Sequence, residues 1–305
     1  MVKLAVFIGC VGYVSLKLSK VINLYQEIDQ QIEHLKTLHK QVYFYLAIFL
    51  VLFNWSLEAW KWKILSSFEK RTSFFDALKG VLAGLGLGAV APLGIGDYLG
   101  RLSVNQYKNR KQLILNLWFG HQCQLFATAF FASLSFLIFF KLNNRPFETF
   151  DILLFFISSC LTLSLSLIIM FFNRIFQKAI ILFNFDDWTV SKLKPSKVSQ
   201  VLLLSILRYF VFASQFYLIS LCFLSKTDTV DFLTSIGLMF FLKSILPAFN
   251  FVSDLGIREF SAMYFFGKLN VDETGIIAIS LTVWCINLFL PSLIGMMIVF
   301  LKRIK

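Results

Sequence analysis

The sequence predicts an all-α polytopic membrane protein with an inverted-topology repeat, made of about six full membrane spans and two re-entrant helical hairpins. The prediction rests on the apolar composition, on the distribution of basic residues among the loops, and on two motifs that interrupt apolar sequence. Of the 305 residues, 58% are hydrophobic and 15% are charged. Soluble domains carry about 25% charged residues, so the composition indicates a chain that folds in a lipid bilayer.

Apolar segments define the predicted elements. They cover residues 2–16, 42–60, 74–93, 113–140, 152–172, 201–224, 232–246 and 275–301. A membrane-crossing helix needs about 20 apolar residues, so these segments are candidate spans or parts of spans. The polar stretch 17–41 has apolar residues at three- and four-residue spacing, which predicts an amphipathic helix. The first run is interpreted as a membrane anchor, and the short loops predict a single integral membrane domain over residues 1–305.

Basic residues are unevenly distributed among the loops. Segments 61–73, 97–111, 173–199 and 302–305 each carry a net charge of +3. The other loops are nearly neutral: 17–41 sums to +1, 141–151 to zero, and 226–231 and 268–273 each to −1. Short loops rich in Lys and Arg face the cytoplasm, which places the N- and C-termini on the cytoplasmic side of the plasma (inner) membrane.

This assignment leaves two apolar segments with both ends on one side. Segment 74–93 has cytoplasmic loops on both sides, and segment 232–267 has outside loops on both sides. Each is therefore predicted to turn back inside the membrane as a helical hairpin. The resulting order of span, span, hairpin and span occurs twice with opposite orientation, which predicts a first repeat over 1–140 and an inverted second repeat over 141–305.

The predicted hairpins contain the two motifs that interrupt apolar sequence. The first motif, at 92–101, places Gly94, Gly96, Asp97 and Arg101 at the predicted start of a half-helix. Glycine permits close backbone approach, and free N–H groups at a helix start attract anions such as phosphate. Asp97 is interpreted either as part of a substrate or ion site or as a helix cap that pairs with Arg101.

The second motif, at 247–259, contains Asp254, Gly256, Arg258 and Glu259. Arg258 and Glu259 are adjacent, so on a helix they point in different directions and each needs another partner. Arg258 would face Asp97 or a lipid phosphate, and Glu259 would titrate or hold Lys243. The alternative is an ion-pair lock between the hairpins that binds no ligand.

Two more charged or titratable residues lie inside apolar segments. His121 stands beside Gln122 and is either a packed, hydrogen-bonded residue or a proton relay. Arg208 is interpreted as an interface anchor. The candidate substrate-binding residues are therefore Asp97, Arg101, Arg258, Glu259, Gly94, Gly96, Gly256, Asp254, Lys243 and His121.

Several function classes are disfavoured. A net charge of +12 suits nucleic acid, but no loop is long enough to fold a nucleic-acid-reading domain, so no nucleic-acid partner is expected. The five cysteines lie in apolar runs without metal-ligand or disulfide spacing. No nucleophile triad, phosphate loop or zinc spacing is present, so no catalytic residue, metal or cofactor is expected and the chain is not predicted to be an enzyme.

The motifs resemble those of the flippase-like membrane family that includes the transmembrane region of lysylphosphatidylglycerol synthases. The likeness covers residue 60 to the C-terminus and rests on 61–65 leading to 92–101, on 246–259, and on Asn287 to Pro291 with Gly295. This sequence departs from the family pattern at Ser253-Asp254, where a glycine pair is usual, and at Gly120-His121-Gln122. The resemblance implies a lipid-linked cargo. It does not imply aminoacyl transfer.

The leading hypothesis is a flippase-like protein that moves an anionic lipid or lipid-linked headgroup between leaflets through a central polar site formed by the two hairpins. One alternative is a non-catalytic membrane subunit or embedded lipid-precursor enzyme that works with a soluble partner on the cytoplasmic face. Another is an ion-coupled carrier of a small solute. The sequence leaves the oligomeric state open.

Overall fold

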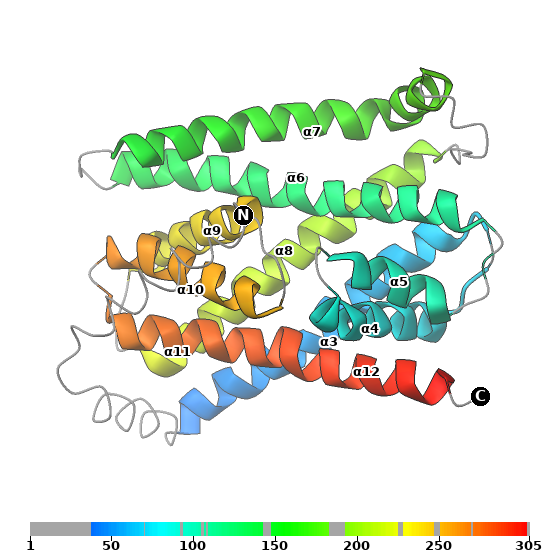
Figure 1. The fold of residues 1–305 in the computed structure, drawn as a ribbon. Helices are drawn as coiled ribbons and strands as arrows, with labels where there is room; N and C mark the ends of the chain where they lie inside the picture. The colour runs from blue at the N-terminus through cyan, green and yellow to red at the C-terminus, as the bar shows by residue number, and fades with distance from the viewer. Residues whose placement is uncertain are drawn as a thin grey trace. The chain divides into compact units, whose positions relative to one another are not determined.

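The computed structural model describes residues 38–69, 71–91, 94–104, 107, 109–142, 148–182, 193–224, 228–246, 251–269 and 271–303. In these ranges every regular element is a helix (Figure 1). The predicted anchor at 2–16 and nearly all of the predicted amphipathic helix at 17–41 lie outside the described residues. The prolines of both motifs, Pro92 and Pro247, also lie outside them.

The helices follow the predicted apolar segments. Their bounds are α3 (Leu38–Ser66), α4 (Phe74–Val90), α5 (Ile95–Val104), α6 (Arg110–Leu142), α7 (Thr149–Leu182), α8 (Pro195–Phe223), α9 (Thr229–Ile245), α10 (Phe251–Gly267), α11 (Glu273–Trp284), the π-helix η2 (Cys285–Phe289) and α12 (Leu290–Arg303). Each of the two predicted hairpins is a pair of short helices, α4 with α5 and α9 with α10.

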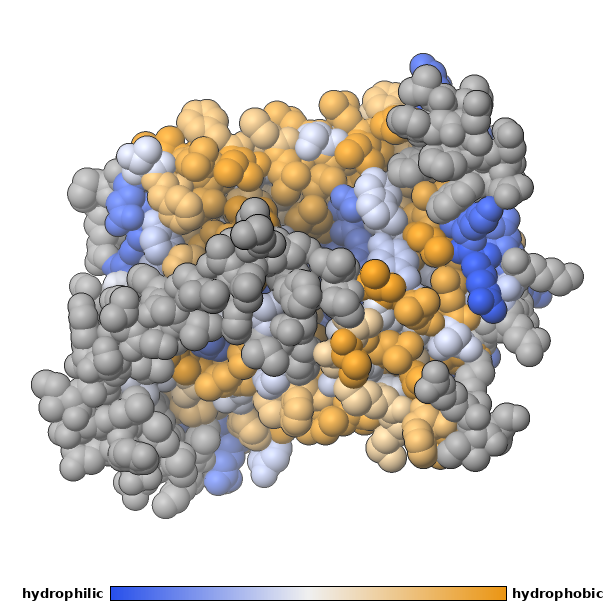
Figure 2. All heavy atoms as spheres, viewed as in Figure 1, coloured by the Kyte–Doolittle hydropathy of each residue, from blue (hydrophilic) through white to orange (hydrophobic). Residues whose placement is uncertain are grey.

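Within the described part of the chain, five helical stretches are long and apolar enough to cross a membrane. They are Lys40–Ser66, Arg110–Phe139, Thr149–Ile175, Pro195–Phe223 and Glu273–Leu301. These stretches match five of the predicted spans, and Figure 2 shows apolar side chains over much of the described surface in that view. Leu52 and Met170, for example, are 65% and 76% exposed, as expected of side chains that face lipid. The described part of the chain is all-helical, and these stretches indicate an integral membrane protein.

The chain forms two compact units, and each takes segments from both predicted repeats. Unit 1 consists of residues up to 53, 131–155 and 211–290, and contains the α9–α10 hairpin. Unit 2 consists of 54–130, 156–210 and 291–305, and contains the α4–α5 hairpin. All four segments with a basic excess belong to unit 2, whereas loops 141–151, 226–231 and 268–273 belong to unit 1. The single-domain organisation and the two-repeat division stay predictions.

Glycines determine how closely the two helices of unit 2's hairpin approach. A Cβ at Gly100 would overlap the backbone of Ala83 and Gly84, and a Cβ at Gly96 would overlap the backbone of Leu87. The later residue of α5, Gly100, meets the earlier part of α4, and the earlier residue, Gly96, meets the later part. The two helices are therefore antiparallel. Gly94 precedes α5 with a φ of +73°, a left-handed conformation that glycine adopts without strain.

The opposite face of α4 contacts α12 in the same way. A Cβ at Gly86 would overlap the backbone of Gly295, and a Cβ at Gly295 would overlap that of Leu82. Small residues of this kind let membrane helices pack through their backbones. The α4 helix is therefore held on two sides, by α5 and by α12, through contacts that leave no room for an added Cβ.

In unit 1 the α9–α10 hairpin packs through aromatic rings. The Phe232 ring lies 4.6 Å from that of Phe266, which stacks on Phe216 at 5.7 Å. The α10 helix is followed by Lys268, whose ammonium lies 2.6 and 2.7 Å from the two carboxylate oxygens of Asp151 at the start of α7. The Tyr264 hydroxyl donates to the same carboxylate at 3.2 Å. This polar cluster fixes the end of the hairpin against α7.

Candidate functional site

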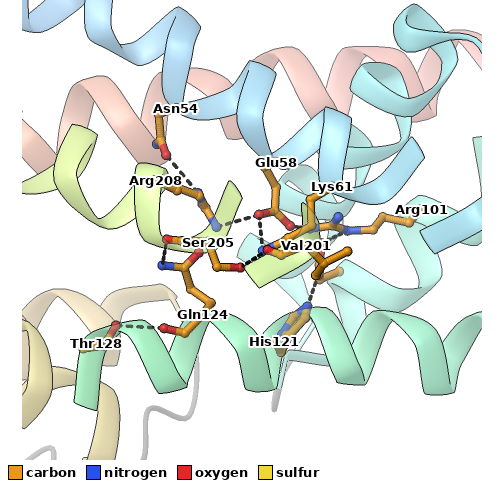
Figure 3. A network of polar contacts seen from close by, with 11 residues as sticks. Asn54, Glu58, Lys61, Arg101, His121, Gln124, Thr128, Val201, Ser205 and Arg208 are labelled. Atoms are coloured by element: carbon orange, nitrogen blue, oxygen red, sulfur yellow. Dashed lines mark hydrogen bonds and ion pairs between the residues drawn. The ribbon is translucent and has the colours of Figure 1, made fainter. Parts of the chain in front are cut away.

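Unit 2 contains a buried network of charged side chains centred on Glu58 of α3 (Figure 3). One Glu58 carboxylate oxygen accepts a hydrogen bond from Arg101 Nη2 at 2.9 Å. The other oxygen accepts one from Arg208 Nη1 at 2.8 Å and lies 2.7 Å from Lys61 Nζ. Glu58 and Lys61 are each 2% exposed and Arg101 is 4% exposed, so α3, α8 and the α4–α5 hairpin meet at one carboxylate away from water.

Arg101 connects this carboxylate to the start of α5. Its Nε donates to Asp97 Oδ1 at 2.8 Å, four residues earlier on the same helix. The second Asp97 oxygen lies 3.1 Å from His121 Nε2 of α6, and the His121 ring stacks on Tyr98 at 5.7 Å. Gly84 of α4 leaves the room that Asp97 occupies, because a Cβ there would overlap the Asp97 carboxylate. Asp97, Arg101 and His121, chosen from sequence, therefore form one cluster.

Arg208 of α8 is held on its other side by Asn54 of α3. Its Nε donates to Asn54 Oδ1 at 2.9 Å, and its guanidinium lies over the Trp55 ring at 5.2 Å. The interpretation of Arg208 as an interface anchor did not include this contact with Glu58. A planar guanidinium suits such bridging because its donors diverge in one plane.

Among the described residues, the charges of the network do not cancel. Lys61, Arg101 and Arg208 carry three positive charges, whereas Glu58 and Asp97 carry two negative charges. The excess of one positive charge is accompanied by two buried donors, Arg101 Nη1 and Trp62 Nε1, that have no acceptor among the described residues. The Arg101 guanidinium lies 5.7 Å from the centre of the Trp62 ring. Unsatisfied buried donors beside excess positive charge favour an anionic ligand.

Unit 1 contains a second charged group on its own hairpin. Asp254 of α10 lies 2.8 Å from Lys243 Nζ of α9 through one oxygen and 3.4 Å from Arg258 Nη2 through the other. Glu259 is next to Arg258 in sequence and is 5% exposed. Lys243 binds Asp254, so the suggestion that Glu259 would hold Lys243 is wrong.

The two hairpins repeat one ion-pair pattern. In each, the second helix places an Asp four residues before an Arg: Asp97 with Arg101 on α5, and Asp254 with Arg258 on α10. A match of the two Gly-Ile-x-acid sequences would instead equate Asp97 with Glu259. The ion pairs favour the alignment of Asp97 with Asp254 and of Arg101 with Arg258. In this alignment Glu259 corresponds to Leu102 of α5, so it has no charged counterpart there.

The candidate glycines have different roles. Gly96 is buried against the backbone of α4, so it serves helix packing. Gly94 is exposed with nothing within 4 Å of its Cβ position, and Gly256 is half-buried. Contact between Arg258 and Asp97, which lie in different units, stays a prediction.

Sequence reasoning missed the centre of the unit 2 network. Glu58 and Asn54 lie in a predicted span, and Lys61 was assigned to a cytoplasmic loop although α3 continues to Ser66. The available signal was the Glu58 to Lys61 spacing, which places both residues on one face of a helix. Because Lys61 is buried, it does not count as a loop charge. The rest of segment 61–73 still has a net charge of +2, so this loop remains basic.

The described residues contain no group of three or more His, Cys, Asp or Glu side chains placed to hold a metal ion.

A family model for the lysylphosphatidylglycerol synthase transmembrane region matches residues 1–295. A search of curated proteins found no match. Since the family model covers nearly the whole chain, including both hairpins and the buried network of unit 2, the protein belongs to the family of the lysylphosphatidylglycerol synthase transmembrane region.

Proposed function

We propose that this protein moves an anionic phospholipid between the two leaflets of the plasma membrane, and that its charged hairpins bind the lipid headgroup. Family membership supports a role with lipids. The observation that carries the proposal is the excess positive charge in unit 2, where buried Arg101 presents Nη1 without an acceptor among the described residues.

A phosphate oxygen is the ligand chemistry that completes this site. It would accept from Arg101 Nη1 and would balance the positive charge left over after Glu58 and Asp97. The buried indole N–H of Trp62, which follows Lys61 on α3, is a second donor without an acceptor in the described part of the chain. Headgroups without net charge would leave the excess unbalanced, so selectivity for anionic lipids follows.

Movement between leaflets requires access from both sides, and the hairpin arrangement supports this requirement. The four basic segments belong to unit 2 with the α4–α5 hairpin, and the nearly neutral loops 141–151, 226–231 and 268–273 belong to unit 1 with the α9–α10 hairpin. In the proposed topology the hairpins are re-entrant, and the first opens from the cytoplasm and the second from outside. The proposed activity is transport and forms no covalent bond.

A leaflet-resolved assay tests the proposal. The purified full-length chain would be placed in liposomes with fluorescent phosphatidylglycerol or phosphatidylcholine, and movement would be followed by quenching the outer leaflet. We expect faster movement of phosphatidylglycerol than in protein-free liposomes. Arg101→Gln should slow it about tenfold, because a charge-assisted hydrogen bond contributes about 1.5–3 kcal/mol. Lys79→Gln removes an exposed charge from α4 of the same hairpin and is the matched control.

The assay also separates lipid transport from the subunit and enzyme alternatives. Equal movement with and without protein would exclude autonomous lipid transport, and activity that appears only after adding a cytosolic extract would favour the subunit alternative. A change in the mass of the recovered lipid would indicate an enzyme. Equal effects of Arg101→Gln and Lys79→Gln would remove the Arg101 site from the proposal.

A further inference from the structure

Glu259 of α10 is a buried carboxyl group that forms no ion pair with any described residue. It is 5% exposed, and neither of its oxygens has a hydrogen-bond donor of acceptable geometry among the described residues. The Ser280 hydroxyl of α11 faces it, but this buried hydroxyl also makes no well-formed hydrogen bond in the described part of the chain. Burying an ionised carboxylate without donors is far more costly than burying the neutral acid.

The two cations of the α9–α10 hairpin are directed to Asp254. Arg258 is next to Glu259 in sequence, but its Nη2 is directed to Asp254 at 3.4 Å, and its Nε has no acceptor among the described residues. Lys243 of α9 lies 2.8 Å from the other Asp254 oxygen. Asp254, and not Glu259, therefore receives both positive charges of the hairpin.

The other described elements packed on α10 place no further charged side chain against Glu259. The α6 and α8 helices contact the end of α10 through the aromatic rings of Phe136 and Phe216. The ionic groups beyond the same end of α10 pair with one another: Lys268, Asp151 and Glu148, joined by the Tyr264 hydroxyl. Among the described groups, Arg258, Asp254 and Lys243 are thus the charges relevant to Glu259.

The protonation of Glu259 determines the net charge of this hairpin site. With a proton on Glu259, Lys243 and Arg258 exceed Asp254 by one positive charge. Without the proton, the four side chains sum to zero. The protonated state attracts an anion and the deprotonated state does not. A proton and an anionic headgroup should therefore bind cooperatively, so that each strengthens the binding of the other.

We propose that Glu259 is a proton-binding site that controls the affinity of the α9–α10 hairpin for an anionic lipid headgroup, with protonation raising that affinity. The identity of the ligand as a lipid rests on the proposed function. Lipid movement would then respond to a proton gradient, because the proton enters with the headgroup and leaves as the headgroup is released. Lowering the pH adds the proton and therefore strengthens anion binding.

Binding and infrared measurements on the purified full-length chain in detergent test this proposal. The binding probe is fluorescent phosphatidylglycerol in mixed micelles, titrated at several values between about pH 5 and 9. We expect wild-type affinity to rise about tenfold toward low pH, within the range common for coupled ligands. Glu259→Gln, which keeps the size and neutrality of the acid, should bind tightly at every pH. Glu273→Gln, a carboxyl change at the start of α11, should follow the wild type.

Infrared difference spectra provide a readout that needs no lipid. The carbonyl stretch of a protonated carboxylic acid should be present at neutral pH in the wild type and absent in Glu259→Gln. Absence of the band from the wild type, or a pH dependence of binding that persists in Glu259→Gln, would overturn the proposal. Lipid movement in liposomes with pH-independent binding would overturn it while leaving transport intact. Proton-linked binding without any movement would support the site and overturn the proposed transport.

Discussion

Glu58 and Arg101 lie 43 residues apart in the sequence and form a 2.9 Å ion pair in which neither side chain is more than 5% exposed. The pair attaches the second helix of the α4–α5 hairpin to α3. Lys61 and Arg208 contact the same carboxylate, so three cations depend on one anion at this position. The network is therefore sensitive to loss of Glu58 in particular.

Glu58→Gln should destabilise the protein by about 3–5 kcal/mol, because removing one partner of a buried ion pair leaves the other charges uncompensated. The thermal unfolding midpoint in detergent, followed by tryptophan fluorescence, measures the loss. The double variant Glu58→Gln/Lys61→Met removes one cation as well and should recover part of the stability. An unchanged midpoint in the single variant would contradict the central role of Glu58.

Gly100→Ala should separate α5 from α4, because the new methyl group would overlap the backbone of Ala83 and Gly84. Overpacking of this kind costs about 1–3 kcal/mol. Gly267→Ala, at the end of α10, is the control, since nothing lies within 4 Å of its Cβ position. Unfolding midpoints of the two variants should differ, with only Gly100→Ala below the wild type. Equal midpoints would show that the hairpin contact is looser than described.

Asp151→Asn should weaken the cluster that fixes α10 to α7. The Asp151 side chain is 6% exposed and lies 2.6 Å from Lys268 Nζ, so its loss should cost about 1–3 kcal/mol. Glu148 is the control residue, because its side chain is 63% exposed and lies 3.7 Å from Lys268 Nζ. Exposed pairs contribute less than about 1 kcal/mol, so Glu148→Gln should have little effect. Chemical unfolding of both variants compares them, and a larger effect for Glu148→Gln would reverse the interpretation.

Asp254→Asn should shift Glu259 toward its ionised form. With Asp254 neutral, Lys243 and Arg258 become two uncompensated cations on the hairpin that contains Glu259, and positive charge favours a carboxylate. The infrared band of the protonated acid should therefore weaken at neutral pH. Asp231→Asn, in the first turn of α9, should leave the band unchanged. A band that stays constant in Asp254→Asn would show that the two carboxyl groups are electrostatically independent.

Much of the fold could be predicted because it depends on local chemistry. The apolar runs were long enough to indicate five of the helical stretches that can cross a membrane. Gly and Pro at the two motifs identified where apolar segments break, and each break separates two short helices. The ion pair between Asp97 and Arg101 was also accessible, since residues four apart are neighbours on a helix.

The centre of the charged network could not be predicted in the same way. Glu58 and Arg208 are 150 residues apart, and nothing local in sequence indicates that they meet. Lys61 is the clearest case, because a lysine at the end of an apolar run is indistinguishable from a cytoplasmic loop charge until the helix end is known. The same limit applied to Lys243, which was a candidate partner for Glu259 and binds Asp254.

The sequence by itself determined that this is a helical membrane protein with two helix breaks, each next to a helix that contains charged residues and glycine, because hydropathy, helix spacing and backbone freedom are properties of neighbouring residues. Only the tertiary structure decided which charges neutralise each other, since ion pairing inside a membrane protein depends on distances between helices remote in sequence. It thereby distinguished Arg101 and Glu58, which share a buried ion pair, from Glu259, whose oxygens have no donor among the described residues.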